Sequence, residues 1–145
     1  MKLPKELLNG VIIFIAIGIY FLLMDILGLA HLFYLRFLNI IFLFYGANKT
    51  IRMNIKEGKN KFVINAVSVM LTCIIAVFLS IIGLVVYSNL HGDDSYLHSL
   101  SKTFLFAGNP SIDAYSVSLL FEGLASSVIV TLVLMLLWNN TFKTD

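Results

Sequence analysis

The sequence predicts an all-α fold, a bundle of four transmembrane helices that forms a single integral membrane domain over residues 1–145. Apolar residues make up 59% of the chain and charged residues 12%, whereas an average soluble domain has about 45–50% and about 25%. The apolar residues form four continuous runs, whereas the strands of a membrane β-barrel would alternate in polarity over about ten residues. This composition excludes an ordinary soluble domain, a disordered segment and a nucleic-acid-binding module, whose basic surface needs many more charges.

The four apolar runs approach or exceed the length of a helix that crosses the membrane, which takes about 20 mostly apolar residues. The predicted spans are residues 7–29, 32–47, 62–87 and 115–138. The second span is the shortest and contains Arg36, so its depth in the membrane is less well defined than that of the others. The first span is longer than the apolar core of about 7–15 residues in a cleaved signal peptide, so we expect the chain to retain it.

The basic residues predict the orientation, because Lys and Arg stay on the cytoplasmic side of membrane helices. If the N-terminus lies inside, eight of the ten Lys and Arg residues fall in cytoplasmic segments, and only Lys102 falls outside. Both termini are therefore expected in the cytoplasm. The first outer loop, 28–31, is then tight, the inner loop, 48–61, is basic, and the second outer loop, 88–114, is the longest.

Two of these loops carry local helical signals. Residues 48–57 contain no Gly or Pro, and Gly58 suits the position just after a helix end, so the second span is expected to continue as a helix into the cytoplasm. In the second outer loop, apolar residues at helical spacing predict a short amphipathic helix on the outer surface. These residues are Tyr96, Leu97, Leu100 and Phe104.

Small side chains recur every four residues on the third and fourth spans, and such a spacing lets helix backbones approach closely. These helix-packing residues are Ser68, Thr72, Ala76 and Ser80 on the third span and Gly123, Ser127 and Thr131 on the fourth. Packing of the two spans inside one bundle explains both faces most simply. The alternative is a seam between copies of the chain, or a face on which a membrane protein partner docks.

Three ionisable residues lie inside predicted spans, where an unpaired charge costs about 2.5–3.5 kcal/mol. Asp25, Arg36 and Glu122 each lie about four to seven residues from the outer end of their span, hence at similar depths. We expect them to form an intramembrane polar cluster with Asn39, which shares a helix face with Arg36. The favoured interpretation is a salt bridge that fixes the helix register. The alternative is a transport or binding site in which one carboxyl group accepts a proton.

The sequence gives no strong signal for a cofactor or for catalysis. His31, His91 and His98 all fall in predicted outer loops, and no two of them have the short spacing of metal ligands. The chain has no glycine motif for nucleotides, and its single cysteine, Cys73, forms no internal disulfide and is expected to pack in the interior. We therefore expect no metal, no cofactor, no catalytic residue and no enzymatic activity.

Taken together, the four spans, the tight first hairpin, the basic inner loop at 48–61, the longer outer loop and the small residues of the last span resemble a known group of proteins. The chain resembles the small four-span membrane proteins of unknown function that occur mostly in Bacteroidota, and residues 36–87 carry most of the resemblance. The resemblance implies a multi-pass protein of the bacterial inner membrane with no catalytic residue.

The expected function is that of a non-enzymatic membrane scaffold, or of an accessory subunit in a larger inner-membrane assembly. Its expected partners are the lipid bilayer and either a second copy of the chain or another membrane protein. The alternative is a small proton- or cation-coupled carrier or channel that uses the cluster of Asp25, Arg36 and Glu122. A membrane enzyme or redox subunit is the least supported of the three.

Overall fold

The computed structural model of the chain describes residues 4–30, 32–90 and 112–142, and 88% of these residues are helical, with no strand among them. The helices are α1 (Lys5–Ile26), α2 (Phe33–Arg36), α3 (Asn39–Lys56), α4 (Phe62–Leu90) and α6 (Ile112–Trp138), followed by the 3₁₀ turn η1 (Asn139–Thr141). The all-helical fold class is therefore confirmed. The amphipathic helix expected around residues 96–104 lies outside the described residues.

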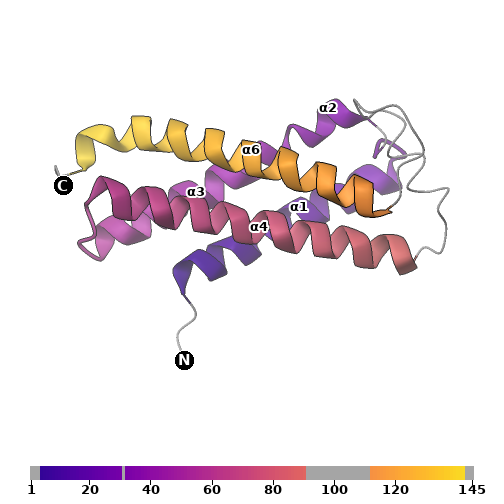
Figure 1. Cartoon of the computed structure of the whole chain (residues 1–145), viewed down its shortest axis with the longest axis horizontal. Helices are drawn as coiled ribbons and strands as arrows, with labels where there is room; N and C mark the ends of the chain where they lie inside the picture. Colours follow the sequence, from indigo (N-terminus) through magenta and orange to yellow (C-terminus); the bar gives the residue numbers. More distant parts are fainter. Residues whose placement is uncertain (1–3, 31, 91–111, 143–145) are drawn as a thin grey trace.

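Helix α4 lies at the centre of the contacts, since it packs against α1, α3 and α6, while α3 also packs against α1 and α6. Figure 1 shows α4 and α6 lying lengthwise in front of α1 and α3. The turn between α3 and α4 lies at the same end of the bundle as the C-terminal end of α6, and α2 lies toward the opposite end (Figure 1).

In the described part of the chain, three helices are long and apolar enough to cross a membrane, namely Lys5–Ile26, Phe62–Leu90 and Ala114–Thr141. They match the first, third and fourth predicted spans and indicate a membrane protein. The predicted second span, 32–47, is not one helix. It is divided between α2 and the first half of α3. The second half of α3 carries Lys49, Arg52 and Lys56, so α3 as a whole is too polar to count as a membrane-spanning helix.

The predicted helical extension through residues 48–57 is confirmed, because α3 runs without a break to Lys56. Beyond it, the N–H of Gly58 donates to the carbonyl of Ile55 and the N–H of Lys59 donates to that of Asn54, both at 2.9 Å. Gly58 has φ +77°, a left-handed conformation that L side chains rarely adopt. This arrangement is the Schellman motif expected from a glycine just past a helix end.

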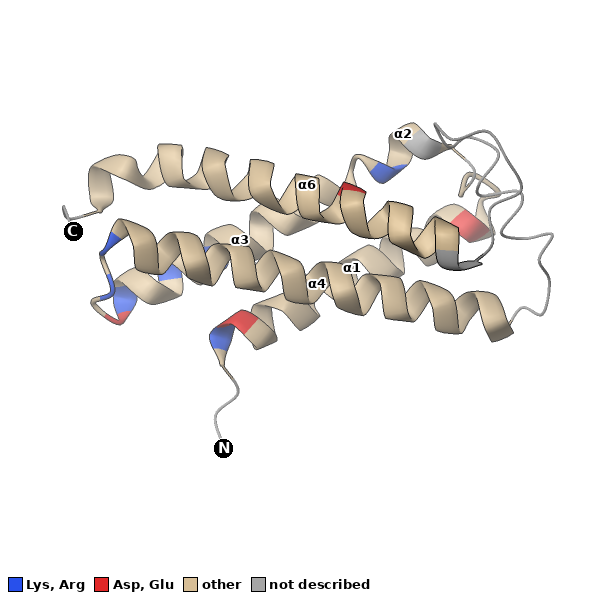
Figure 2. Ribbon diagram, viewed as in Figure 1, with Lys and Arg blue, Asp and Glu red and all other residues tan. Residues whose placement is uncertain are grey.

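Charged side chains join the beginning of α1 to the turn after α3. Lys5 forms an ion pair with Glu57, and the ammonium of Lys59 lies 3.1 Å from the same carboxylate. Figure 2 shows Lys and Arg residues gathered around this turn. The hydrogen bond from Lys5, followed by that from Lys59, holds the pKa of Glu57 below its ordinary value. The contact is therefore present above that ordinary value and is lost as the pH falls through the lowered pKa.

The small-residue faces of α4 and α6 lie largely inside the bundle. Six of the seven predicted packing positions are buried or closely packed: Ser68, Thr72, Ala76, Gly123, Ser127 and Thr131. A Cβ atom at Gly123 would lie 2.5 Å from Cγ1 of Val77 on α4, so the two backbones are as close as a glycine allows. Cys73 is buried beside this face. Packing inside one bundle, in which α4 contacts α1 and α3 as well as α6, accounts for the pattern without a second copy or a partner.

A hydrogen-bonded group of polar side chains joins α1, α3 and α4 in the interior. The amide of Asn9 donates to the hydroxyl of Thr50 at 2.9 Å, and the hydroxyls of Thr50 and Thr72 lie 3.0 Å apart. All three side chains are fully buried. Because lipid tails offer no hydrogen bonds, a polar side chain in this position is satisfied by another helix, which helps to set the register of the three helices.

Substitution of Thr50 by valine is expected to lower the free energy of unfolding by about 1 kcal/mol, because the amide of Asn9 and the hydroxyl of Thr72 both lose a partner. The measurement is equilibrium unfolding in mixtures of mild detergent and dodecyl sulfate. Thr131→Val is the matched control, since the hydroxyl of Thr131 donates to a carbonyl of its own helix at 2.7 Å and meets, among the described residues, no polar group of another helix except the weakly accepting sulfur of Met70 at 3.7 Å. If both variants lose the same stability, the contact between helices contributes nothing.

Candidate functional site

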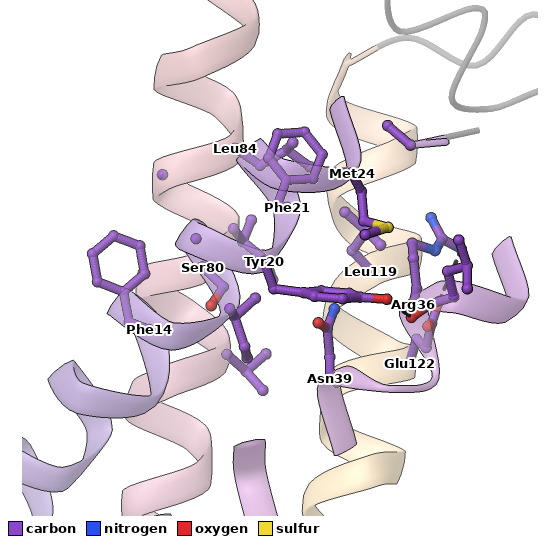
Figure 3. Close-up of a pocket in the computed structure, with 18 of the residues that line it drawn as sticks. Phe14, Tyr20, Phe21, Met24, Arg36, Asn39, Ser80, Leu84, Leu119 and Glu122 are labelled. Carbon is purple, nitrogen blue, oxygen red and sulfur yellow. Dashed lines mark hydrogen bonds and ion pairs between the residues drawn. The ribbon is translucent and has the colours of Figure 1, made fainter. Parts of the chain in front are cut away.

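A cavity of about 310 Å³ lies between the helices, and residues of α1, α2, α3, α4 and α6 line it. Most of its wall is apolar, and Figure 3 shows Phe14, Phe21 and Leu84 among the side chains around it. The polar side chains of the described lining are fewer: Arg36, Glu122, Asn39, Ser80, Ser126 and the tyrosines Tyr20, Tyr87 and Tyr115. An apolar pocket of at least about 300 Å³ with a few polar groups is typical of a small-molecule site.

The backbone around α2 brings Arg36 to this cavity. After α1, Gly28 has φ +69° and turns the chain back, and α2 then makes a single helical turn that ends at Arg36. Phe37 and Leu38 follow with tight bonds to carbonyls three residues earlier, and α3 begins only at Asn39. The break between the two helices thus separates Arg36 from α3 and lets its side chain reach α6 (Figure 3).

The guanidinium of Arg36 holds two side chains of α6. Its Nη1 donates to the hydroxyl of Tyr115 at 2.8 Å, and its Nη2 lies 3.4 Å from Oε2 of Glu122. Tyr115 is buried, and the Arg36 and Glu122 side chains are 21% and 37% exposed. The two opposite charges neutralise each other where lone charges would be costly. The predicted proximity of a cation and an acid in this region therefore takes the form of an α2–α6 ion pair.

Asp25 occupies a different place. The hydroxyl of Tyr87 on α4 donates to its Oδ2 at 2.7 Å, and Asp25 is not among the residues that line the cavity. In the described residues, the ion pair of Arg36 is with Glu122, although Asp25 and Arg36 flank the first turn of the chain. Of the four predicted cluster residues, the structure brings Arg36, Asn39 and Glu122 to one cavity and places Asp25 against α4.

Asn39 on α3 and Ser80 on α4 also line the cavity. Oδ1 of Asn39 and Oγ of Ser80 are buried and have no hydrogen-bond partner among the described residues. Figure 3 shows the Asn39 side chain rising from α3 toward the ring of Tyr20. The hydroxyl of Tyr20 is itself used, since it donates to the carbonyl of Leu35 at 3.0 Å. Ser80, predicted as a packing residue, therefore belongs to the cavity.

Tyr115 was not predicted as a member of the polar cluster, and Asn9 and Thr50 were not predicted as polar contacts between helices. Tyr115 and Glu122 are seven residues apart, two turns on one helix face, and this spacing could have placed both on the face that Arg36 contacts. Asn9 lies in an apolar run, where an uncharged amide also needs a hydrogen-bond partner. Its partner on α3 could not be named without the packing of the helices.

The described residues contain no group of three His, Cys, Asp or Glu side chains that could hold a metal ion. His31, His91 and His98 lie outside the described residues, so the expectation about them is not tested.

Comparisons of the chain with protein-family models, with curated proteins and with solved structures gave no match. The fold and the site therefore define only a class of protein. It is a helical protein whose described residues include three apolar helices suited to a membrane and a mainly apolar cavity between the helices.

Proposed function

We propose that the chain is a non-enzymatic integral membrane protein that binds a small molecule from the bilayer in the cavity beside Arg36 and Glu122. The observation that supports this function is the cavity itself, which combines apolar walls with an ion pair and unpartnered polar atoms. Such a protein acts either as a carrier for that molecule or as the subunit that binds it in a larger assembly.

The expected role as a scaffold has less support. It rested on the small-residue faces of α4 and α6, and most of these residues are used inside the bundle. A proton- or cation-coupled carrier that uses Asp25 with Arg36 and Glu122 is also less favoured. Among the described residues of the cavity wall, the ion pair leaves no net charge for a cation to bind, and Asp25 is not one of these residues.

We also propose four crossings of the bacterial inner membrane, with both termini in the cytoplasm and an amphipathic helix in the second outer loop. Lys5 pairs with Glu57, just past α3, and the ring of Phe142, just past α6, lies 5.8 Å from that of Phe62 at the start of α4, so the start of α1, the turn between α3 and α4 and the end of α6 lie at one end of the bundle. A chain that begins α1 and α4 at the same end must cross back through α2 and α3. The basic residues gathered at that end favour the cytoplasmic side.

Filling the cavity tests the proposed function. A Cβ atom at Gly18, which lines the cavity, would meet no atom within 4 Å, so Gly18→Trp is expected to place its indole in the cavity without disturbing the helices. Gly18→Ala is the matched control, because it adds one methyl group and leaves most of the cavity open.

The probe is a small apolar diazirine that partitions into phosphatidylcholine vesicles containing the full chain. Photolabelling of cavity residues on α1 and α4, mapped by mass spectrometry, is expected in the wild type and in Gly18→Ala and to be largely lost in Gly18→Trp. Equal labelling of all three proteins would contradict a binding cavity.

A further inference from the structure

Among the described residues that line the cavity, one basic and one acidic side chain lie side by side. These residues are Arg36 and Glu122, and Nη2 of Arg36 lies 3.4 Å from Oε2 of Glu122. A ligand with a charged head would therefore meet no net opposite charge, and its own charge would be left uncompensated at membrane depth, where this is costly. The electrostatics of the wall favour an uncharged ligand.

Two side chains of the wall, Asn39 and Ser80, have buried polar atoms without a partner among the described residues, and these indicate what an uncharged ligand must offer. Oδ1 of Asn39 is a hydrogen-bond acceptor, and Oγ of Ser80 both accepts and donates. A buried carbonyl oxygen without a partner carries a desolvation penalty that a ligand O–H or N–H group would remove. A purely apolar molecule would leave that penalty in place.

The remaining wall suits an apolar chain or ring. Phe14, Phe21 and Leu84 line the cavity with other apolar side chains of α1, α3 and α4, and Figure 3 shows them apart from the Arg36–Glu122 pair. A ligand with one polar end and one apolar end would place its polar end near Asn39 and its apolar end against these side chains.

We infer that the cavity binds an uncharged amphiphile with a hydroxyl head group, such as a long-chain alcohol or a monoacylglycerol, and that its hydroxyl donates a hydrogen bond to Asn39. This inference rests on the proposed function, because it names the class of molecule that the cavity takes. Asn39 selects the head group, and the apolar walls hold the chain.

Four photoreactive decyl probes with a diazirine near the chain end test the inference, with a hydroxyl, a sulfate, a trimethylammonium or no head group. Each is added to phosphatidylcholine vesicles that contain the full chain, and labelling of cavity peptides is expressed relative to Gly18→Trp in the same vesicles. The hydroxyl probe is expected to label more than either charged probe by roughly tenfold, because an uncompensated charge is costly at this depth.

Asn39→Leu distinguishes recognition of the hydroxyl head group from binding by apolar walls alone. The leucine is similar in size and removes an unpartnered polar atom, so the variant is expected to fold. It should retain labelling by the headless probe and lose the advantage of the hydroxyl probe over it. Ser80→Ala gives a second, independent variant of the polar wall.

The outcomes separate the inference from the proposed function. Stronger labelling by the sulfate or ammonium probe, or equal labelling by the hydroxyl and headless probes with no effect of Asn39→Leu, would overturn the inferred ligand class and leave a binding cavity in place. If no probe labels the cavity peptides above the Gly18→Trp level, the binding function itself fails.

Discussion

Removal of either charge of the Arg36–Glu122 pair is expected to lower the free energy of unfolding by about 1–3 kcal/mol, because the remaining charge loses its partner at membrane depth. Arg36→Gln should cost more than Glu122→Gln, since it also removes the donor to Tyr115, a bond of 2.8 Å. The double variant Arg36→Gln/Glu122→Gln should lose less than the sum of the two single losses, because it leaves no lone charge.

Equilibrium unfolding in mild detergent with increasing dodecyl sulfate, followed by circular dichroism, measures all four proteins. The coupling between the two substitutions is expected to reach about 1 kcal/mol, within the range for residues in direct contact. The matched cycle of Asp25→Asn with Arg36→Gln should show simple addition, because the hydroxyl of Tyr87 is the described partner of Asp25. A strong coupling in that second cycle, with none in the first, would show that Arg36 pairs with Asp25 and would contradict the pairing with Glu122.

These two cycles reflect what the sequence could and could not predict about the cluster. The number of residues to a span end estimates how deep Asp25, Arg36 and Glu122 lie, because a helix rises by a constant 1.5 Å per residue. Counting residues does not give the rotation of one helix against another. That rotation depends on which side chains interlock, and here it turns Glu122 toward Arg36 and Asp25 toward Tyr87.

Local signals were the most predictable part of the fold. Gly58 ends α3 as expected, because a left-handed residue after a helix is a property of the neighbouring backbone alone. The extension of α3 to Lys56 follows from the same local pattern. The break at Phe37 and Leu38 was not predictable, since neither residue is a helix breaker and the break depends on where Arg36 finds its partners.

The cavity could not be predicted from the sequence either, because it depends on how the helices pack. Its wall takes residues from five helices, and none of those segments has a motif for a ligand. Ser80 continues the four-residue spacing of Ser68, Thr72 and Ala76, yet it lines the cavity while those three lie in the packed interior. A regular pattern on one helix cannot show where its neighbours diverge.

Glycine positions on the packed faces are expected to show the other large effect on stability. Gly123→Ala should lower the free energy of unfolding by about 1–3 kcal/mol, because its new methyl group would lie 2.5 Å from Cγ1 of Val77 and 3.3 Å from its Cβ. A branched side chain fixed at its Cβ cannot turn away, so the two helices themselves must move apart. Gly10→Ala should behave alike, with Ile75 at 2.7 Å and the carbonyl of Thr72 at 3.2 Å.

Gly18→Ala is the control, because its effect on the free energy of unfolding is expected to have the opposite direction or to be absent. In an isolated helix, alanine is more favourable than glycine by about 0.8–1.0 kcal/mol, so a substitution that meets no atom should be neutral or stabilising. The same chemical change is therefore expected to raise or preserve the unfolding midpoint at Gly18 and to lower it at Gly10 and Gly123, in one titration series. If all three variants moved the midpoint in the same direction, helix propensity would outweigh packing, and the close approach of α4 to α1 and α6 would not limit stability.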